Sequence, residues 1–157
     1  MKKIKFFVLF FVVFCNIISA QSADKVTEMI EVQTVNLEEV AYFASSYYNI
    51  IDETEDNIVA LTELKKYFQY DKITTPETAL SYEDFAYFCT QTWNIKGGLM
   101  LMATKSPRYA FKELQFMGYI PQSIDPSTKI DGIQALTIMT NCIEFAEINQ
   151  TIDFDLL

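Results

Sequence analysis

Apolar residues recur at helical spacing in two stretches of the chain, residues 35–50 and residues 80–95. In each stretch the apolar positions fall three or four residues apart, which places them on one face of an α-helix and the polar residues on the other. The apolar positions are Leu37, Val40, Ala41, Ala44 and Tyr48 in the first stretch, and Tyr82, Phe85, Ala86, Cys89 and Trp93 in the second. The pattern predicts two amphipathic helices.

The two stretches also align with each other without a gap. The identical pairs are Glu38/Glu83, Ala41/Ala86, Tyr42/Tyr87, Phe43/Phe88, Asn49/Asn94 and Ile50/Ile95. Each predicted helix follows a natural N-cap residue, Asn36 or Ser81, and an acidic residue stands three positions later, where it can accept hydrogen bonds from free amides. The chain therefore repeats one helix.

A second alignment places residues 57–92 on residues 107–142. The matching pairs are Ala60/Ala110, Glu63/Glu113, Leu64/Leu114, Pro76/Pro126, Thr78/Thr128 and Thr90/Thr140. Each copy predicts a helix, a loop containing Pro-x-Thr and a second helix, and in the later copy Ser106, Pro107 and Gly118 mark where the first helix begins and ends. We expect an all-α fold in which a half repeat over about 36–49 and helical hairpins over about 57–94 and 107–147 stack around one core.

Two segments, residues 24–35 and residues 94–105, do not align clearly with the repeat. Residues 24–35 are a candidate helix before the half repeat, but they match their supposed counterparts poorly. In the linker of residues 94–105, we expect Gly97 to end the preceding helix. Residues 99–102 are too apolar for a solvated loop, so we expect this linker to lie across the core as a short extended piece.

The N-terminus predicts export. Residues 1–20 combine three lysines, an apolar run over residues 6–14 and the small residues Ser19 and Ala20, a combination typical of a secretory signal peptide. We expect cleavage after Ala20, a single domain over residues 21–157 and no membrane span after cleavage. Cys15 raises the alternative of a lipoprotein, but the bulky Phe14 precedes it where that motif requires a small residue, so we expect no lipid.

The acidic net charge of the chain disfavours anionic partners. The full chain has a net charge of −9, and cleavage removes three lysines and no acid, so the exported protein is still more acidic. Such a charge repels nucleic acid and anionic lipid headgroups and favours solubility or a cationic partner. We expect no nucleic-acid partner, and a solvated acidic surface is the simpler interpretation of the remaining acids.

Candidate chemistry is sparse. The chain has no histidine, which removes the commonest general base and the Ser-His and Cys-His nucleophile arrangements. Adjacent carboxylates lie at helix starts or on polar faces. The loop from Asp125 has Lys129, Ile130 and Leu136 where an EF-hand requires an oxygen ligand, a glycine and a glutamate. The adjacent carboxylates are Glu38/Glu39, Asp52/Glu53, Glu55/Asp56 and Glu83/Asp84. We therefore expect a noncatalytic protein without a metal or cofactor.

Cys89 and Cys142 are the cysteines that remain after signal cleavage. In an oxidising compartment an even pair is a disulfide candidate, and two buried free thiols are the alternative. Two thiols without a histidine cannot complete a closed four-ligand zinc site.

The hairpin resembles the S-layer homology (SLH) domain, a bacterial cell-surface module. The resemblance rests on residues 106–143, with an aromatic-rich first helix, a glycine turn, an Asp-Pro loop and a second helix entered through Ile130, and on a weaker copy over residues 57–93. It implies three repeats packed as a pseudo-threefold helical bundle whose grooves hold anionic cell-wall polysaccharide. The family's groove motif, Ile-Thr-Arg-Ala-Glu, corresponds here to residues 80–84 and 130–134, which lack its basic residue.

The sequence thus predicts an exported, noncatalytic interaction or structural module of the bacterial cell envelope, located in the periplasm or at the cell surface. Its expected partner is an envelope protein or a cell-wall polymer, and the alternative function is a glycan-binding module with an altered groove. Tyr42 and Tyr87 are the candidate binding residues, because each lies about 140° around its helix from the apolar stripe. The alternative role for both rings is to cover a neighbouring hairpin.

Overall fold

The computed structural model describes residues 23–52, 54–73 and 77–149 of the 157-residue chain. This part consists of helices and loops, with one isolated antiparallel bridge between Ser81 and Lys129, so the predicted all-α class is confirmed. Three predictions concern residues outside the described ranges: the signal peptide over residues 1–20, the absence of a lipid on Cys15, and the loop containing Pro76.

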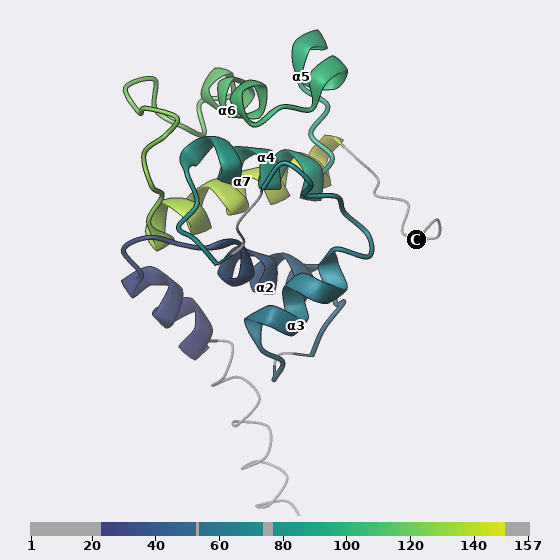
Figure 1. Ribbon diagram of the computed structural model, residues 1–157, viewed down its shortest axis with the longest axis vertical. Coiled ribbons are helices and arrows are strands. Elements are labelled where there is room, and N and C mark those ends of the chain that lie inside the picture. The colour runs from purple at the N-terminus through teal and green to yellow at the C-terminus, as the bar shows by residue number, and fades with distance from the viewer. Residues whose placement is uncertain (1–22, 53, 74–76, 150–157) are drawn as a thin grey trace, which may run out of the picture.

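The helices follow one another with short and long connections (Figure 1). Residues 23–31 are helical and precede the labelled helices. These are α2 (Leu37–Tyr47), α3 (Asn57–Leu64), α4 (Tyr82–Thr92), α5 (Leu99–Thr104), α6 (Pro107–Phe116) and α7 (Gly132–Asn149).

The helix starts follow the predicted capping chemistry. At α2, Glu39 donates its backbone N–H to Asn36 Oδ1 (2.9 Å) and Asn36 donates its own N–H to Glu39 Oε2 (2.8 Å), which completes a capping box. At α4, Asp84 donates its N–H to Ser81 Oγ (3.2 Å), while the Ser81 hydroxyl donates to the Asp84 carboxylate. Ser106 precedes Pro107 at the start of α6, as predicted, although its side chain makes no capping hydrogen bond.

Two helix ends use asparagine rather than glycine. Asn49 after α2 and Asn94 after α4 adopt left-handed backbone angles, with φ of 54° and 48°. The next residue in each case donates its N–H back to the helix, from Ile50 to the Ser45 carbonyl and from Ile95 to the Thr90 carbonyl. The prediction that Gly97 ends the helix containing Trp93 is therefore wrong: α4 ends at Thr92, and Asn94 supplies the left-handed residue.

The linker after α4 also differs from the prediction. Residues 99–104 form the helix α5 rather than an extended piece across the core, and of its apolar residues only Leu101 is buried. Both ends of α5 are held by side chains from elsewhere: Gly98 donates its N–H to Glu113 Oε2 (2.8 Å), and Lys72 donates to the Thr104 carbonyl (2.6 Å). These contacts satisfy backbone groups at the helix ends, so the segment is helical despite its length.

A closed ring of backbone hydrogen bonds joins the starts of α2, α4 and α7. Val35 donates its N–H to the Ile130 carbonyl (3.0 Å), Ile130 to Leu80 (3.2 Å) and Leu80 to Val35 (2.7 Å). All three residues are buried, and each directly precedes the residue that caps its helix. The ring brings three distant parts of the chain to one point in the core.

Each of these three helices packs against a further helix. The main packing partners are α2 with α3 and α4 with α6, and α4 also contacts α7. The sequence predicted a hairpin in which residues 57–64 pair with the helix over residues 82–92. In the structure the extensive contacts instead join α2 to α3 and α4 to α6. The long connections over residues 65–81 and 117–131 carry the chain from one pair to the next.

The helix over residues 23–31 lies against the start of α7, where Gly132 permits a close approach (Figure 1). A Cβ atom at Gly132 would lie 1.6 Å from the Met29 carbonyl oxygen, so only glycine fits there. The Gly132 N–H donates to the Val32 carbonyl (3.0 Å), and Met29 is buried. The N-terminal segment thus packs against the start of α7, a helix that α4 also contacts.

Candidate functional site

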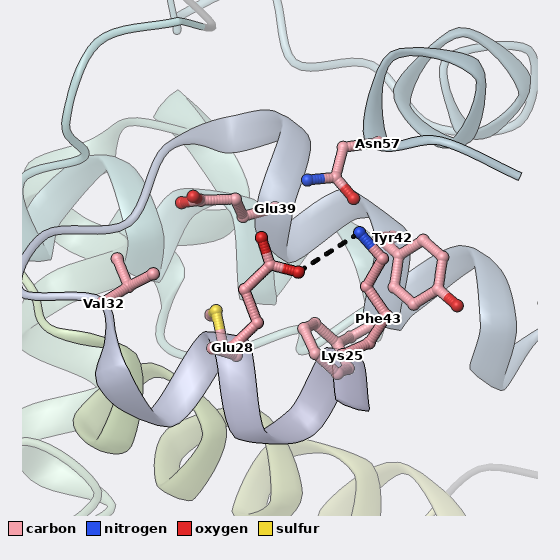
Figure 2. Close-up of a pocket in the computed structure, with 8 residues that line it drawn as sticks. Lys25, Glu28, Val32, Glu39, Tyr42, Phe43 and Asn57 are labelled. Carbon is pink, nitrogen blue, oxygen red and sulfur yellow. Dashed lines mark ion pairs between the residues drawn. The ribbon is translucent and has the colours of Figure 1, made fainter. Parts of the chain in front are cut away.

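A shallow pocket lies between the helix over residues 23–31, α2 and the first residue of α3 (Figure 2). Its volume is about 20 Å³, which is room for one water molecule or one polar group of a ligand. Its lining residues are Lys25, Glu28, Met29, Val32, Glu39, Tyr42, Phe43 and Asn57. We call it the Tyr42 pocket.

An ion pair spans this pocket. The Lys25 ammonium lies 3.4 Å from Glu28 Oε2, one turn along the same helix, and Figure 2 shows the Glu28 carboxylate directed toward it. The same ammonium lies 5.3 Å from the centroid of the Tyr42 ring, within the range of a cation–π interaction. Lys25 therefore links the N-terminal helix to α2 and places a positive charge in the pocket.

The second carboxylate of the pocket has a structural role. Glu39 accepts the Asn36 backbone N–H in the capping box of α2, which orients its side chain along the start of that helix. Glu28 is paired with Lys25 and Glu39 accepts a backbone amide, so each carboxylate already has a partner within the protein. This arrangement suits hydrogen bonding to a polar partner better than proton transfer.

The structure does not bring the two predicted binding residues together. Tyr42 lines the Tyr42 pocket, whereas Tyr87 lies on α4 and its hydroxyl donates to Asp71 Oδ1 (2.9 Å). Their residues are only 3% and 2% exposed, so neither offers an open ring face for stacking. The packing role that was the alternative interpretation accounts for this burial, and a binding role is left only for the part of Tyr42 that borders its pocket.

Sequence reasoning did not identify Lys25. The available signal was its position three residues before Glu28 in a candidate helix, a spacing that places both side chains on one helical face. The sequence could not place that face against Tyr42, because the contact depends on how the N-terminal helix packs.

Cys89 and Cys142 are brought together from α4 and α7. Both are fully buried, and both are free thiols in this structure. Burial raises the pKa of the Cys89 thiol, and a hydrogen bond with the Cys142 side chain and the charge of that group raise it further. The two thiols are thus neighbours, and the raised pKa keeps the Cys89 thiol protonated at neutral pH. That they form a disulfide stays a prediction.

The described residues contain no candidate membrane-spanning helix and no candidate metal-binding cluster. Among them, no helix combines the length and the apolar character needed to cross a membrane. Nor do residues 23–52, 54–73 and 77–149 hold a cluster of three or more acidic, cysteine or histidine side chains arranged for a metal ion.

The sequence matches no protein-family model, and no curated protein or solved structure is significantly similar to it. The resemblance to the SLH domain therefore stays a prediction, and function is argued from the residues themselves.

Proposed function

We propose that this protein is an exported, noncatalytic interaction module of the bacterial cell envelope that binds a polar group of its partner at the Tyr42 pocket. The observation that carries this proposal is the Lys25–Glu28 ion pair beside the Tyr42 ring, at a pocket that is open to solvent and large enough for one polar group. Such a pair offers both a donor and an acceptor to a hydroxyl, an amide or a charged side chain.

The scaffold supports binding because it holds the pocket in place before a partner arrives. The ring through Val35, Leu80 and Ile130 joins the starts of three helices, and the close contact at Gly132 fixes the N-terminal helix that carries Lys25. A preformed site loses less conformational entropy when it binds. The ring is also compatible with the pseudo-threefold bundle that the SLH resemblance implies, since Val35, Leu80 and Ile130 are equivalent positions of the sequence repeats.

An envelope protein is the partner that we favour, because a single side chain of such a protein would fill the pocket. A cell-wall glycan is the second candidate, and Lys25 is the observation in its favour. The motif at residues 80–84 and 130–134 lacks the family's basic residue, but Lys25 brings a cation to a groove between helices from a segment outside that motif.

Binding of the processed protein to purified cell-wall polymer and to solubilised envelope proteins tests the proposal. Lys25→Ala is expected to weaken binding to one of the two fractions about tenfold or more, because it removes a charged hydrogen-bond donor. Lys66→Ala is the matched control: Lys66 also pairs with a glutamate three residues away, Glu63, but lies on another surface. Equal losses in both variants, or binding to neither fraction, would contradict the proposal.

A further inference from the structure

One end of the molecule exposes large apolar side chains. They belong to residues 96–116, which include α5 and α6 and which we call the α5–α6 cap. Leu99, Met100 and Met102 of α5 are 83%, 60% and 57% exposed, and Phe116 at the end of α6 is 86% exposed. In Figure 1, α5 projects beyond the other helices at this end. Soluble proteins rarely expose so much apolar surface without a partner.

The exposed apolar side chains come from two helices that contact each other. The N-terminus of α5 is held against α6 by the hydrogen bond from Gly98 to Glu113, and Phe116 lies one turn beyond Glu113 on nearly the same face of α6. At the other end of α5, Lys72 holds the Thr104 carbonyl. Because both ends of this short helix are held by other segments, its side chains are displayed on a fixed support.

The segment that contains the α5–α6 cap is basic. Residues 94–124 contain Lys96, Lys105, Arg108 and Lys112, and their single acidic residue is Glu113. The whole chain, by contrast, has twelve basic and twenty-one acidic residues. The ion pairs among the described residues join Lys25 to Glu28 and Lys66 to Glu63, so none of the described ion pairs involves a cation of the cap. Lys112 lies 6.0 Å from the centroid of the Tyr109 ring, within the range of a cation–π interaction.

A cavity of about 230 Å³ lies where α5 meets the end of α4. Its lining residues include the basic Lys96 and Lys105 and the apolar Leu101 and Met102. A cavity lined by two lysines and by apolar residues suits an anionic group that is attached to an apolar chain.

We propose that the α5–α6 cap binds the surface of a membrane that contains anionic phospholipid, with its exposed apolar side chains in the interface and Lys96 and Lys105 at the lipid phosphates. A bilayer admits projecting apolar side chains without needing a complementary hollow, whereas a hydrated glycan would leave them in water. The acidic charge of the rest of the chain would be repelled by such a surface, which orients the cap toward it. This inference goes beyond the proposed function, since it concerns a different surface.

Tryptophan fluorescence of the full chain tests which surface enters the membrane. The probes are vesicles of phosphatidylcholine alone and of phosphatidylcholine mixed with phosphatidylglycerol. In a Leu99→Trp variant we expect a blue shift of the emission with the mixed vesicles. The matched control is Ile148→Trp on α7, where the natural residue is 82% exposed, and we expect no shift there. The native Trp93 is fully buried in both variants and provides a constant background.

A second experiment neutralises two lysines of the cap to test whether they contribute to vesicle binding. Lys96→Gln combined with Lys105→Gln in the Leu99→Trp background should weaken the vesicle binding reported by the shift roughly 25-fold, since each basic residue near an anionic surface contributes about fivefold. Lys65→Gln combined with Lys66→Gln changes the net charge equally on another surface and should have little effect. The proposal is overturned if Leu99→Trp shows no shift, if Ile148→Trp shifts equally, or if the two double variants lose equal binding.

Discussion

Tyr42 and Tyr87 occupy the same position in two copies of one helix, yet their surroundings differ. Both side chains are buried. Tyr42 borders an open pocket and lies under the Lys25 ammonium, which comes from the helix before α2. Tyr87 donates its hydroxyl to Asp71, which comes from the connection before α4. The repeat therefore determines burial, while the segment that precedes each copy determines the charge that the tyrosine meets.

The third copy shows the same division. Its helix α7 begins at the backbone ring like α2 and α4, but Gly132 stands near its start and admits the N-terminal helix. Residues that recur in the repeats thus give α2, α4 and α7 the same start and the same buried face. Residues that do not recur, such as Lys25, Asp71 and Gly132, make the surroundings of the three helices different.

The largest expected effects test whether the copies share one frame. Leu64 in α3 and Leu114 in α6 are equivalent positions of the alignment and both are fully buried. Leu64→Ala and Leu114→Ala should each lower the free energy of unfolding by about 2–5 kcal/mol, measured by chemical denaturation. Phe116→Ala, two residues after Leu114 but exposed, is the control. A Leu114→Ala loss no greater than that of Phe116→Ala would show that the alignment does not mark equivalent core positions.

The cysteines distinguish the later copies from the first, which has Ala44 at the position of Cys89. Cys89 and Cys142 are neighbours in the structure, and we predict that they form a disulfide if the protein reaches an oxidising compartment; two buried free thiols are the alternative. The disulfide would close a long loop and stabilise the fold by about 2–4 kcal/mol relative to the reduced protein. Thiol titration of the unfolded, unreduced protein decides the question. No free thiol supports the bridge, and two free thiols per chain show that the pair stays reduced.

Gly132→Ala tests the packing that is particular to the third copy. The added Cβ atom would overlap the Met29 carbonyl, so the N-terminal helix must shift away, at an expected cost of about 1–3 kcal/mol in unfolding free energy. Gly98→Ala is the control, because a Cβ there would meet only the Glu113 carboxylate at 3.5 Å. Urea denaturation of both variants measures the difference. If both variants lose the same stability, the close approach at Gly132 does not hold the N-terminal helix.

Tyr87→Phe tests the hydrogen bond from Tyr87 to Asp71, and we expect it to change the free energy of unfolding least. Loss of the hydroxyl should cost about 0.5–1.5 kcal/mol at neutral pH. Burial raises the pKa of Tyr87, and the hydrogen bond to Asp71 and the charge of that carboxylate raise it further. The stability that depends on the neutral phenol is therefore fully present below the unfolded-state pKa of about 10 and is lost as the pH rises above it.

Denaturation at a series of pH values between neutral and alkaline measures this effect. The difference in unfolding free energy between wild type and Tyr87→Phe should shrink above about pH 10, where the wild type alone must keep this phenol protonated. Other buried tyrosines, including Tyr48 and Tyr70, also have raised pKa values and affect both proteins alike. A difference that stays constant with pH would argue against the hydrogen bond from Tyr87 to Asp71.

The sequence by itself determined the local features of the fold. The spacing of apolar residues predicted the helices α2 and α4, and Asn36 and Ser81 were identified as N-caps because capping involves residues only three positions apart. The burial of Leu64 and Leu114 followed from the repeat for the same reason, since a buried helical face is a property of a short segment.

The tertiary structure alone decided what depends on contacts between distant segments. α5 is helical because Lys72 and Glu113 hold its ends, Gly132 receives a helix that lies a hundred residues earlier in the chain, and Lys25 reaches Tyr42 across that packing. The strongly acidic net charge concealed the basic segment over residues 94–124, because net charge sums over the whole chain. The tertiary structure decided that this segment also exposes the apolar side chains of the α5–α6 cap. Such contacts arise from packing in three dimensions, and periodicity along the chain carries no information about them.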